Sequence, residues 1–367
     1  MRPSILDEEL FDRLATDDGA HLASVFIPTH SSGRDVSQDR IRLKNQLRRV
    51  DAELEGLGLK PRAREDRLRI TSDLLEDREF WEHQAEGLAV YIHEDGNVTA
   101  VAVNYPVNES AIVMPVFLVR PLLSELKGPE LPVLALTRDE VGLFVANLRG
   151  ARRSLVDLPG SFEDVNWFVD REPQRQQHPD RTDTTRARHG HDPSSREDED
   201  VNRFLREVDR ALPADDPLVV LGDDNLVSRF GTITDRHVLS PENSGLQSPF
   251  TESEVMERTA QTLRSLAEQR ERDAIAEANA EIGMGNATTE IAAATSAAIT
   301  GRVRHLVLDP TMDPVWGRIE ETTLEVVQHD DKEHADVDLI DRVVVLSMRN
   351  GAEVTPILRG SSDHPMV

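Results

Sequence analysis

Hydrophobic residues follow two spacings in the first third of the chain. Over residues 36–57, apolar side chains recur every three or four positions, which places them on one stripe of a helix: Leu43, Leu47, Val50, Leu54 and Leu57. The apolar run at 22–28 predicts a buried strand before that helix, and a second helical stretch is expected over 62–84. Apolar runs on either side of the turn residues 95–97 predict a β-hairpin. Together these elements predict an N-terminal α/β domain over residues 1–129.

The middle of the chain reads as a mixed sheet covered by helices. Three short apolar runs joined by polar turns predict an antiparallel meander, at residues 131–137, 141–148 and 152–159. A helical pattern at 201–208 and a strand at 217–222 follow it, an order typical of a mixed sheet with helices packed on it. We expect a central domain over residues 130–250.

A long polar stretch interrupts this central domain. From Asp170 to Asp200 the chain holds no apolar residue larger than Ala187 and proline, so the stretch cannot bury a face and is predicted to be a mobile loop. It is also locally basic, because five arginines stand against three acids between residues 171 and 191: Arg171, Arg175, Arg181, Arg186 and Arg188. Arginine forks suit phosphate and single-stranded RNA, while the alternative is a solvated linker.

The last third of the chain alternates helices with short strands. A long helix is expected from about Thr251 to Ala280, opened by a capping signature, and an Ala-rich helix follows over 288–300. A strand, an acidic loop, a helix and a final strand come next, at 304–309, 329–338, 337–350 and 352–358. This order predicts a small α/β/α sandwich as a C-terminal domain over 251–367, and an α/β (α+β) multidomain fold for the whole chain.

Composition narrows the function classes. The chain has 42 Lys+Arg against 68 Asp+Glu and a formal net charge of -26, which argues against a protein that coats nucleic acid and against DNA as a partner. It contains no cysteine, so disulfides, thiolate zinc sites, iron–sulfur clusters and cysteine nucleophiles are excluded. No window approaches 18 uncharged apolar residues and the start has no signal-peptide pattern, so we expect a soluble cytoplasmic protein without membrane contact.

A second basic cluster lies on the first long helix, at Arg40, Arg42, Lys44, Arg48 and Arg49. At helical spacing several of these side chains can share the face away from the leucine stripe. RNA contact is one interpretation of this cluster. An ordinary solvated face paired with Asp39, Asp51 and Glu53 is the other, and both remain open. Arg42, Lys44 and Arg49 are the RNA-binding candidates from this helix.

Three stretches in this order resemble the bacterial members of the archaeal and eukaryotic class 1 release factor and Pelota superfamily, which includes the ribosome hibernation factor Balon. The stretches read LALTRDEVGLFVANLRGARRSLVDLP, PLVVLGDDNLVSRF and DLIDRVVVLSMRNGAEVTPIL. The resemblance covers roughly residues 132–358, and the first region only by order and size. It implies an RNase H-like central domain and a C-terminal domain related to ribosomal protein L7Ae.

In this superfamily a Gly-Gly-Gln loop between the third meander strand and the next helix reaches the peptidyl transferase centre. The same interval of this chain is 170–200, and it contains no Gly-Gly-Gln. Its nearest match is Arg175-Gln176-Gln177-His178, which makes Gln176 and Gln177 the candidate catalytic residues. Glycines allow a backbone with positive φ to approach the tRNA end closely, which Arg175 and Gln176 do not allow cheaply. The chain also lacks the Asn-Ile-Lys-Ser type of motif that reads stop codons.

The resemblance therefore implies a release-factor-like protein that binds the ribosomal A site in hibernation, protection or stalled-ribosome binding, without codon-directed termination. Its expected partners are rRNA and tRNA of the ribosome, with an elongation factor GTPase as a further candidate, and no cofactor is expected. Two alternatives stay open. One is a peptidyl-tRNA hydrolase or rescue factor that uses Gln176 or Gln177, and the other is a non-ribosomal interaction protein that keeps only the fold.

The sequence supports a metal site or a nuclease site less well than it supports the release factor resemblance. His178, His189 and His191 could supply imidazoles, as could His329 and His334, but no spacing fixes a geometry. An RNase H-like core also suggests a two-metal nuclease built from Asp139, Asp157, Asp223 and Asp224. These acids lie in turns or at strand ends, and turn or capping chemistry is the favoured interpretation.

Overall fold

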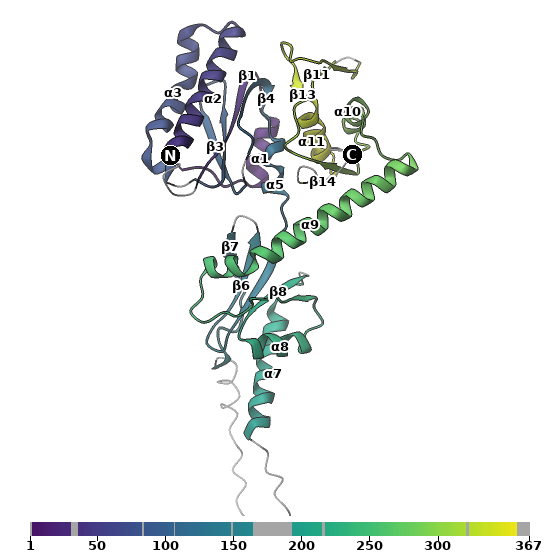
Figure 1. Cartoon of the computed structure of the whole chain (residues 1–367). Helices are drawn as coiled ribbons and strands as arrows, with labels where there is room; N and C mark the ends of the chain where they lie inside the picture. Colours follow the sequence, from purple (N-terminus) through teal and green to yellow (C-terminus); the bar gives the residue numbers. More distant parts are fainter. Residues whose placement is uncertain are drawn as a thin grey trace, which may run out of the picture. The chain divides into compact units, whose positions relative to one another are not determined.

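The computed structural model describes residues 2–30, 36–82, 84–105, 107–147, 150–163, 193–214, 217–320 and 323–357. They form two compact units (Figure 1). One unit combines Met1–Gly128 with Ala267–Val367, and the other is Pro129–Leu266. The predicted α/β fold with several sheets is confirmed. The division into three domains remains a prediction.

The N-terminal sheet of the first unit has four antiparallel strands in the order β3-β2-β1-β4. They are β1 (Asp18–Pro28), β2 (Gly87–Ile92), β3 (Val98–Val103) and β4 (Ser110–Val116). The predicted hairpin is confirmed, since β2 and β3 pair antiparallel and Asp95 accepts a hydrogen bond from the Asn97 N–H at 2.9 Å.

Three helices cover one face of this sheet: α2 (Val36–Gly56), α3 (Pro61–Glu76) and the short α4 (Arg78–Trp81). The stripe predicted for the first long helix faces the sheet, where Leu43, Val50 and Leu54 are fully buried against Val25 and Val90. The predicted second helical stretch is thus two helices, with Asp77 between them as the N-cap of α4.

The opposite face of the sheet shares its core with the C-terminal part of the chain. Helix α1 (Glu8–Thr16) places Phe11 in the same buried cluster as Tyr91 of β2, Ala298 and Val343. The C-terminal elements of this unit are the later part of α9 (Glu252–Met284), α10 (Ile291–Ile299) and α11 (Leu339–Arg349). One hydrophobic core therefore joins segments from both ends of the sequence.

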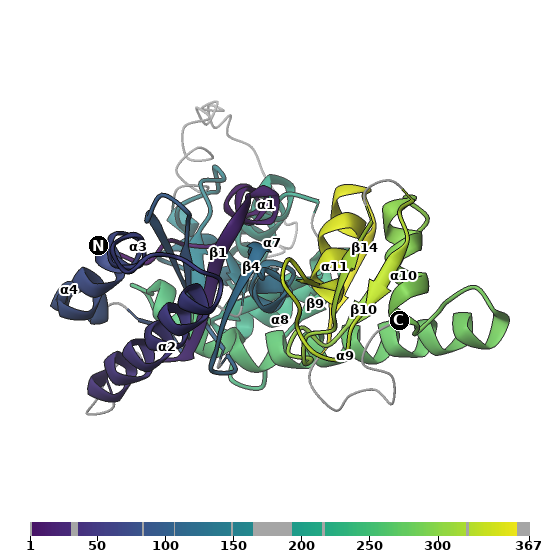
Figure 2. The same cartoon turned by 90° about the horizontal axis from the view of Figure 1, so that it is seen from above.

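Two small sheets accompany these helices. Strands β10 (His305–Leu308) and β14 (Glu353–Pro356) pair in parallel and lie beside α11 (Figure 2). A second sheet of three short antiparallel strands has the order β12-β11-β13, from Val326–Gln328, Trp316–Ile319 and Val337–Asp338. The stretch 329–338, predicted to be a loop throughout, therefore ends in a strand of two residues. So short a strand is set by its partner rather than by local periodicity.

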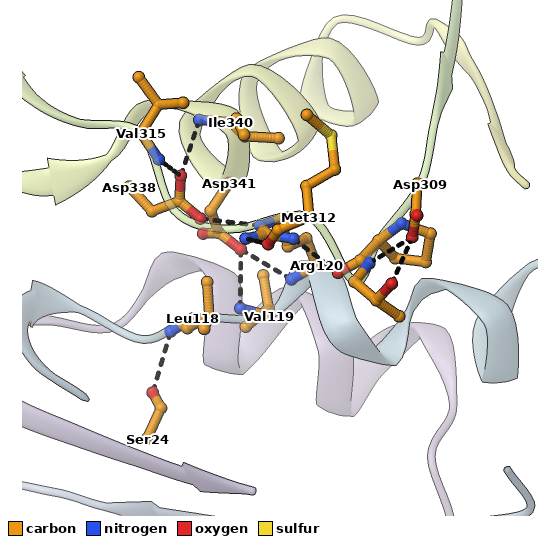
Figure 3. A network of polar contacts seen from close by, with 12 residues as sticks. Ser24, Leu118, Val119, Arg120, Asp309, Met312, Val315, Asp338, Ile340 and Asp341 are labelled. Carbon is orange, nitrogen blue, oxygen red and sulfur yellow. Dashed lines mark hydrogen bonds and ion pairs between the residues drawn. The ribbon is translucent and has the colours of Figure 1, made fainter. Parts of the chain in front are cut away.

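A buried polar network ties the connection after β4 to the C-terminal part of the same unit (Figure 3). The network starts at η1 (Arg120–Leu122), which leads into α5 (Leu123–Leu126). The Arg120 side chain is 2% exposed and donates from Nε to Asp338 Oδ2 at 2.7 Å. Its two terminal nitrogens donate to the carbonyls of Pro310 at 2.6 Å and Met312 at 2.5 Å.

Asp341 on α11 completes the network. Its Oδ1 accepts hydrogen bonds from the backbone N–H groups of Val119 at 2.8 Å and Arg120 at 2.7 Å. Its Oδ2 is buried and has no hydrogen-bond partner among the described residues. Burial, with the nearby charge of Asp338, raises the pKa of Asp341 to about 7.

Replacing Asp341 by asparagine should flatten the dependence of stability on pH. In the unfolded chain an aspartate loses its proton near pH ~3.9, so the native state holds the extra proton between that pH and about 7. The wild type should therefore lose about 3 kcal/mol of unfolding free energy between pH 5 and pH 8 through this group. Asp341→Asn should lack that part of the loss in urea unfolding at the two pH values, and equal losses in both proteins would contradict the assignment.

The central unit holds a mixed five-stranded sheet in the order β7-β6-β5-β8-β9. Its strands are β5 (Leu131–Leu136), β6 (Val141–Asn147), β7 (Gly150–Arg153), β8 (Leu218–Gly222) and β9 (Val238–Leu239). The first three form the predicted meander and β8 joins β5 in parallel. The third strand, β7, is shorter than the predicted run at 152–159 and begins earlier, at Gly150.

Alternate residues of β5 face two different layers. Leu134 and Leu136 pack under α7 (Pro193–Ala211) and α8 (Asp224–Ile233), while Val133 and Ala135 face Val255 at the start of α9. The predicted loop to Asp200 is corrected at its end, because α7 already begins at Pro193. The sequence at 193–200 contains no large apolar residue, so it has no apolar periodicity that would predict a helix.

Candidate nucleic-acid interface

The loop candidates belong to a segment outside the described residues: Arg171, Arg175, Gln176, Gln177, Arg181, Arg186 and Arg188 lie within 164–192. The same holds for the histidines considered as metal ligands in that loop. Arg42, Lys44 and Arg49 lie on α2 and are described. The described residues that bear on the candidates are the two ends of the loop segment, in the central unit, and α2, in the other unit, and each is described by itself.

The near end of the loop segment is held against the central sheet. The Val141 N–H donates to the Gly160 carbonyl at 2.9 Å, and the Phe162 N–H donates to the Arg138 carbonyl at 2.9 Å. The Phe162 ring meets Phe204 of α7 edge to face at 5.7 Å, and the Arg138 guanidinium lies 5.7 Å from the Phe162 ring centre. These contacts hold Phe162 in place at the start of the loop segment.

The far end of the segment is the N-terminal part of α7. Asp198 forms an ion pair with Arg229 of α8, and the next turns bury Val201, Phe204 and Leu205 in the core. Both ends of the loop therefore start from the layer of the central unit that contains α7 and α8. Apolar packing therefore holds the chain in place just before the loop segment, at Phe162, and just after it, at Val201 and Phe204.

The basic residues of α2 divide between two flanks of the helix. Arg40 donates from Nε to the Leu75 carbonyl at 2.7 Å, so its flank faces α3, and Lys44 lies one turn further on the same flank. Arg49 on the other flank donates to Gln46 Oε1 at 3.2 Å, and Arg42 lies seven residues before it. Lys44 and Arg49 are exposed, while Arg42 is half-buried.

The acids near this cluster have specific partners. Asp39 is fully buried and accepts a hydrogen bond from Arg42 Nη1 at 2.8 Å. Asp51 pairs with Arg64 of α3 at 2.8 Å, and Glu53 pairs with Lys332 from the C-terminal part of the unit. A solvated face would pair these three acids with the basic cluster of α2 itself. The structure shows this for Asp39, which binds Arg42, whereas Asp51 and Glu53 bind basic residues outside α2. Lys44 and Arg49 are left at the surface by this arrangement.

The metal and nuclease readings find no support in the described part of the chain. No group of three or more His, Asp or Glu side chains there could hold a metal ion. His329 is bonded through Nδ1 to Asp336 at 2.8 Å. Asp223 accepts hydrogen bonds from the backbone of Asn225 at 3.0 Å and Leu226 at 3.3 Å, which confirms the capping interpretation for this residue.

Helix α9 opens as its sequence predicts. The Thr251 N–H donates to Glu254 Oε2 at 2.9 Å, and the Glu254 N–H donates back to Thr251 Oγ1 at 3.3 Å. The first of these bonds lowers the pKa of Glu254. Among the helices that the structure describes, none is long and apolar enough to cross a membrane.

Comparisons with known proteins found one family model and several solved structures. Residues 132–302 match the model of the bacterial archaeo-eukaryotic release factor family 3. Among curated proteins, none matches the chain. Similar solved structures are those of the archaeal translation termination factor aRF1 and of Archaeoglobus fulgidus Pelota. The first is 13% identical over 98% of this chain and 94% of that chain, with a TM-score of 0.25. The second is 11% identical over 75% and 74%, with a TM-score of 0.29.

A ribosome-bound archaeal Pelota with ABCE1 is also similar, with 8% identity over 98% of this chain and 89% of that chain and a TM-score of 0.34. TM-scores this low do not establish a common arrangement of the whole chain. The matched residues 132–302 contain the meander, the loop interval and the strand and helix that follow it. Residues 132–302 therefore match this bacterial release factor family, and the similarity of the chain to the family rests on this region.

Proposed function

We propose that the protein binds the ribosomal A site and occupies it in hibernation, protection or stalled-ribosome binding, without reading a stop codon. The observation that carries this proposal is the family match over 132–302 combined with a loop that lacks Gly-Gly-Gln. The family match supports binding at the ribosomal A site, where release factors bind. The missing glycines argue against its chemistry, because a close backbone approach to the tRNA end needs positive φ at low cost.

The distribution of charge supports an RNA partner. Net charge is -26, which limits nonspecific association with RNA, yet five arginines gather in the loop at 171–188. In the proposed complex these arginines contact rRNA or tRNA at the peptidyl transferase centre, and Gln176 and Gln177 lie at the loop tip. Lys44 and Arg49 of α2 contact rRNA of the decoding region. An elongation factor GTPase is a further proposed partner, and the cytoplasm is the corresponding location.

Removing charge from the loop should weaken ribosome binding more than removing the same charge elsewhere. The triple variant Arg181→Gln, Arg186→Gln, Arg188→Gln should lower the affinity for 70S ribosomes by about tenfold or more, because each lost arginine removes a charge-assisted contact to phosphate. The matched control is Lys60→Gln, Arg62→Gln, Arg69→Gln, three exposed cations at the start of and along α3. Co-sedimentation through a sucrose cushion at fixed salt measures both.

Two results would overturn the proposal: a wild-type protein that stays at the top of the gradient, or a loop variant that binds as the control does. The same preparations distinguish the hydrolase alternative. Release of a labelled peptide from a stalled complex, lost in a Gln176→Ala, Gln177→Ala double variant, would assign hydrolysis to the loop tip in place of occupancy.

A further inference from the structure

The buried carboxylate of Asp39 accepts several hydrogen bonds near the end of β1. Asp39 on α2 has a fully buried side chain, and its Oδ2 accepts from the His30 backbone N–H at 2.9 Å. The His30 ring approaches the same carboxylate, with Nδ1 3.0 Å from Oδ1. Thr29 fixes the strand end by donating from Oγ1 to the Ala85 carbonyl at 2.8 Å. The position of His30 is therefore set by backbone and side-chain bonds together.

The carboxylate also decides which nitrogen of His30 carries a proton. Asp39 accepts from Arg42 as well, so it acts as a charged acceptor and has no proton to give. Nδ1 of His30 must then be the donor, and in the neutral ring this leaves Nε2 as an acceptor. The His30 side chain is 41% exposed, so the ring is partly open to a ligand.

Arg42 places a second recognition group beside this ring. Its Nη1 lies 2.8 Å from Asp39 Oδ1 and His30 Nδ1 lies 3.0 Å from the same oxygen, so these two nitrogens are at most about 6 Å apart. The Arg42 side chain is 30% exposed. Within the described part of the chain Asp39 is its bonded partner, which leaves further guanidinium donors for a ligand.

An acceptor nitrogen beside a guanidinium matches one nucleotide of RNA. The ribose 2′-hydroxyl can donate a hydrogen bond, and the adjacent phosphate accepts from arginine. DNA has the phosphate but no 2′-hydroxyl, so the two groups would respond differently to the two nucleic acids. We propose that His30 and Arg42, both held by Asp39, form a ribose and phosphate site that selects RNA over DNA.

In this site His30 binds the ribose, Arg42 binds the phosphate and Asp39 is the positioning residue. The proposal deepens the ribosome-binding function, on which it rests for its biological setting, by naming two residues and the chemistry that they read. It adds His30 and Asp39 to an interface for which the sequence suggested Arg42, Lys44 and Arg49. Arg49 lies two helical turns beyond Arg42, on the flank along which a strand of RNA would continue.

Matched RNA and DNA oligonucleotides test the site directly. The full chain is titrated into a labelled short single-stranded RNA and into DNA of the corresponding sequence, with fluorescence anisotropy as the readout. The wild type should bind RNA about tenfold more tightly than DNA. His30→Asn, whose amide can replace Nδ1 but has nothing at the Nε2 position, should lose that preference and keep its DNA affinity. Arg42→Gln should weaken both by about tenfold and lower the salt slope by about 0.7.

Arg69→Gln on α3 is the control, since it removes one exposed cation and should leave both affinities near those of the wild type. Urea unfolding of each variant separates lost contacts from lost structure. Asp39→Asn gives a second route, because this variant, if folded, no longer fixes the His30 tautomer and should reduce the RNA preference with Arg42 still present.

The proposal is overturned if the wild type does not prefer RNA, if His30→Asn leaves the preference unchanged, or if Arg42→Gln behaves as Arg69→Gln does. Its failure is distinguishable from that of the ribosome-binding proposal. RNA preference without co-sedimentation defeats only ribosome binding. Co-sedimentation that is unaffected by His30→Asn and Arg42→Gln, with no RNA preference, defeats only this site.

Discussion

Replacing Arg120 by alanine should lower the free energy of unfolding by about 3–5 kcal/mol. The guanidinium is almost fully buried, and its loss leaves the Asp338 carboxylate and the carbonyls of Pro310 and Met312 without their donor. Leaving a buried charge unpaired costs more unfolding free energy than the intact ion pair contributes. We therefore expect a larger loss of stability than for most single substitutions. Urea unfolding followed by circular dichroism measures it.

A matched exposed residue and a double variant make the result specific. Arg69→Ala removes an arginine from the surface of α3 and should change the stability by about 0.5 kcal/mol or less. Asp338→Asn keeps an oxygen to cap α11 but removes the charge, so Arg120→Ala should cost less in its presence. An Arg120→Ala variant as stable as Arg69→Ala would show that the network does not hold the two parts of the unit together.

Replacing Gly222 by alanine should destabilise the central unit by about 3 kcal/mol or more. Gly222 ends β8 with φ 145°, and a Cβ built there would lie 1.8 Å from the Leu136 carbonyl oxygen of β5. That carbonyl also accepts from the Asp223 N–H at 3.2 Å, so neither chain can move away without losing the strand end and the cap of α8.

Gly231 provides a control with the opposite expected sign. It lies inside α8, and an added Cβ meets nothing within 4 Å. Gly231→Ala should therefore stabilise the helix by about 0.5–1 kcal/mol, because alanine loses less backbone entropy there. Thermal and urea unfolding of the two variants should move in opposite directions. A Gly222→Ala protein with wild-type stability would mean that β5 and β8 do not approach as closely as described.

Elements with a local signature were predictable from the sequence. The stripe from Leu43 to Leu54 predicted α2, and the Asp95, Gly96 and Asn97 turn predicted the β2–β3 hairpin. The order of runs in the middle of the chain predicted a mixed sheet, because the three meander strands and β8 each carry their own apolar pattern. The spacing of apolar residues predicts a helix or strand and its buried face when the element is long enough for the spacing to recur.

Long-range associations were not predictable in the same way. Arg120 directly follows an apolar run, and nothing nearby in sequence indicates that Asp338 and Asp341 surround it. His30 and Asp39 are nine residues apart across a strand end and a helix start, so no motif spacing announced them. The sequence suggested Arg42 as a surface cation, whereas its bond to buried Asp39 appears only when β1 and α2 are packed.

The shared core of the first unit has a consequence for the order of folding during synthesis. The central unit is continuous in sequence, from Pro129 to Leu266, so all its strands are available once that stretch has emerged. The N-terminal sheet must instead wait for α10, α11 and β10 to complete the core on the face that bears Tyr91, where Phe11 of α1 also packs. We therefore expect the nascent chain to keep an uncovered apolar face for most of its translation, and to complete its first-made sheet last.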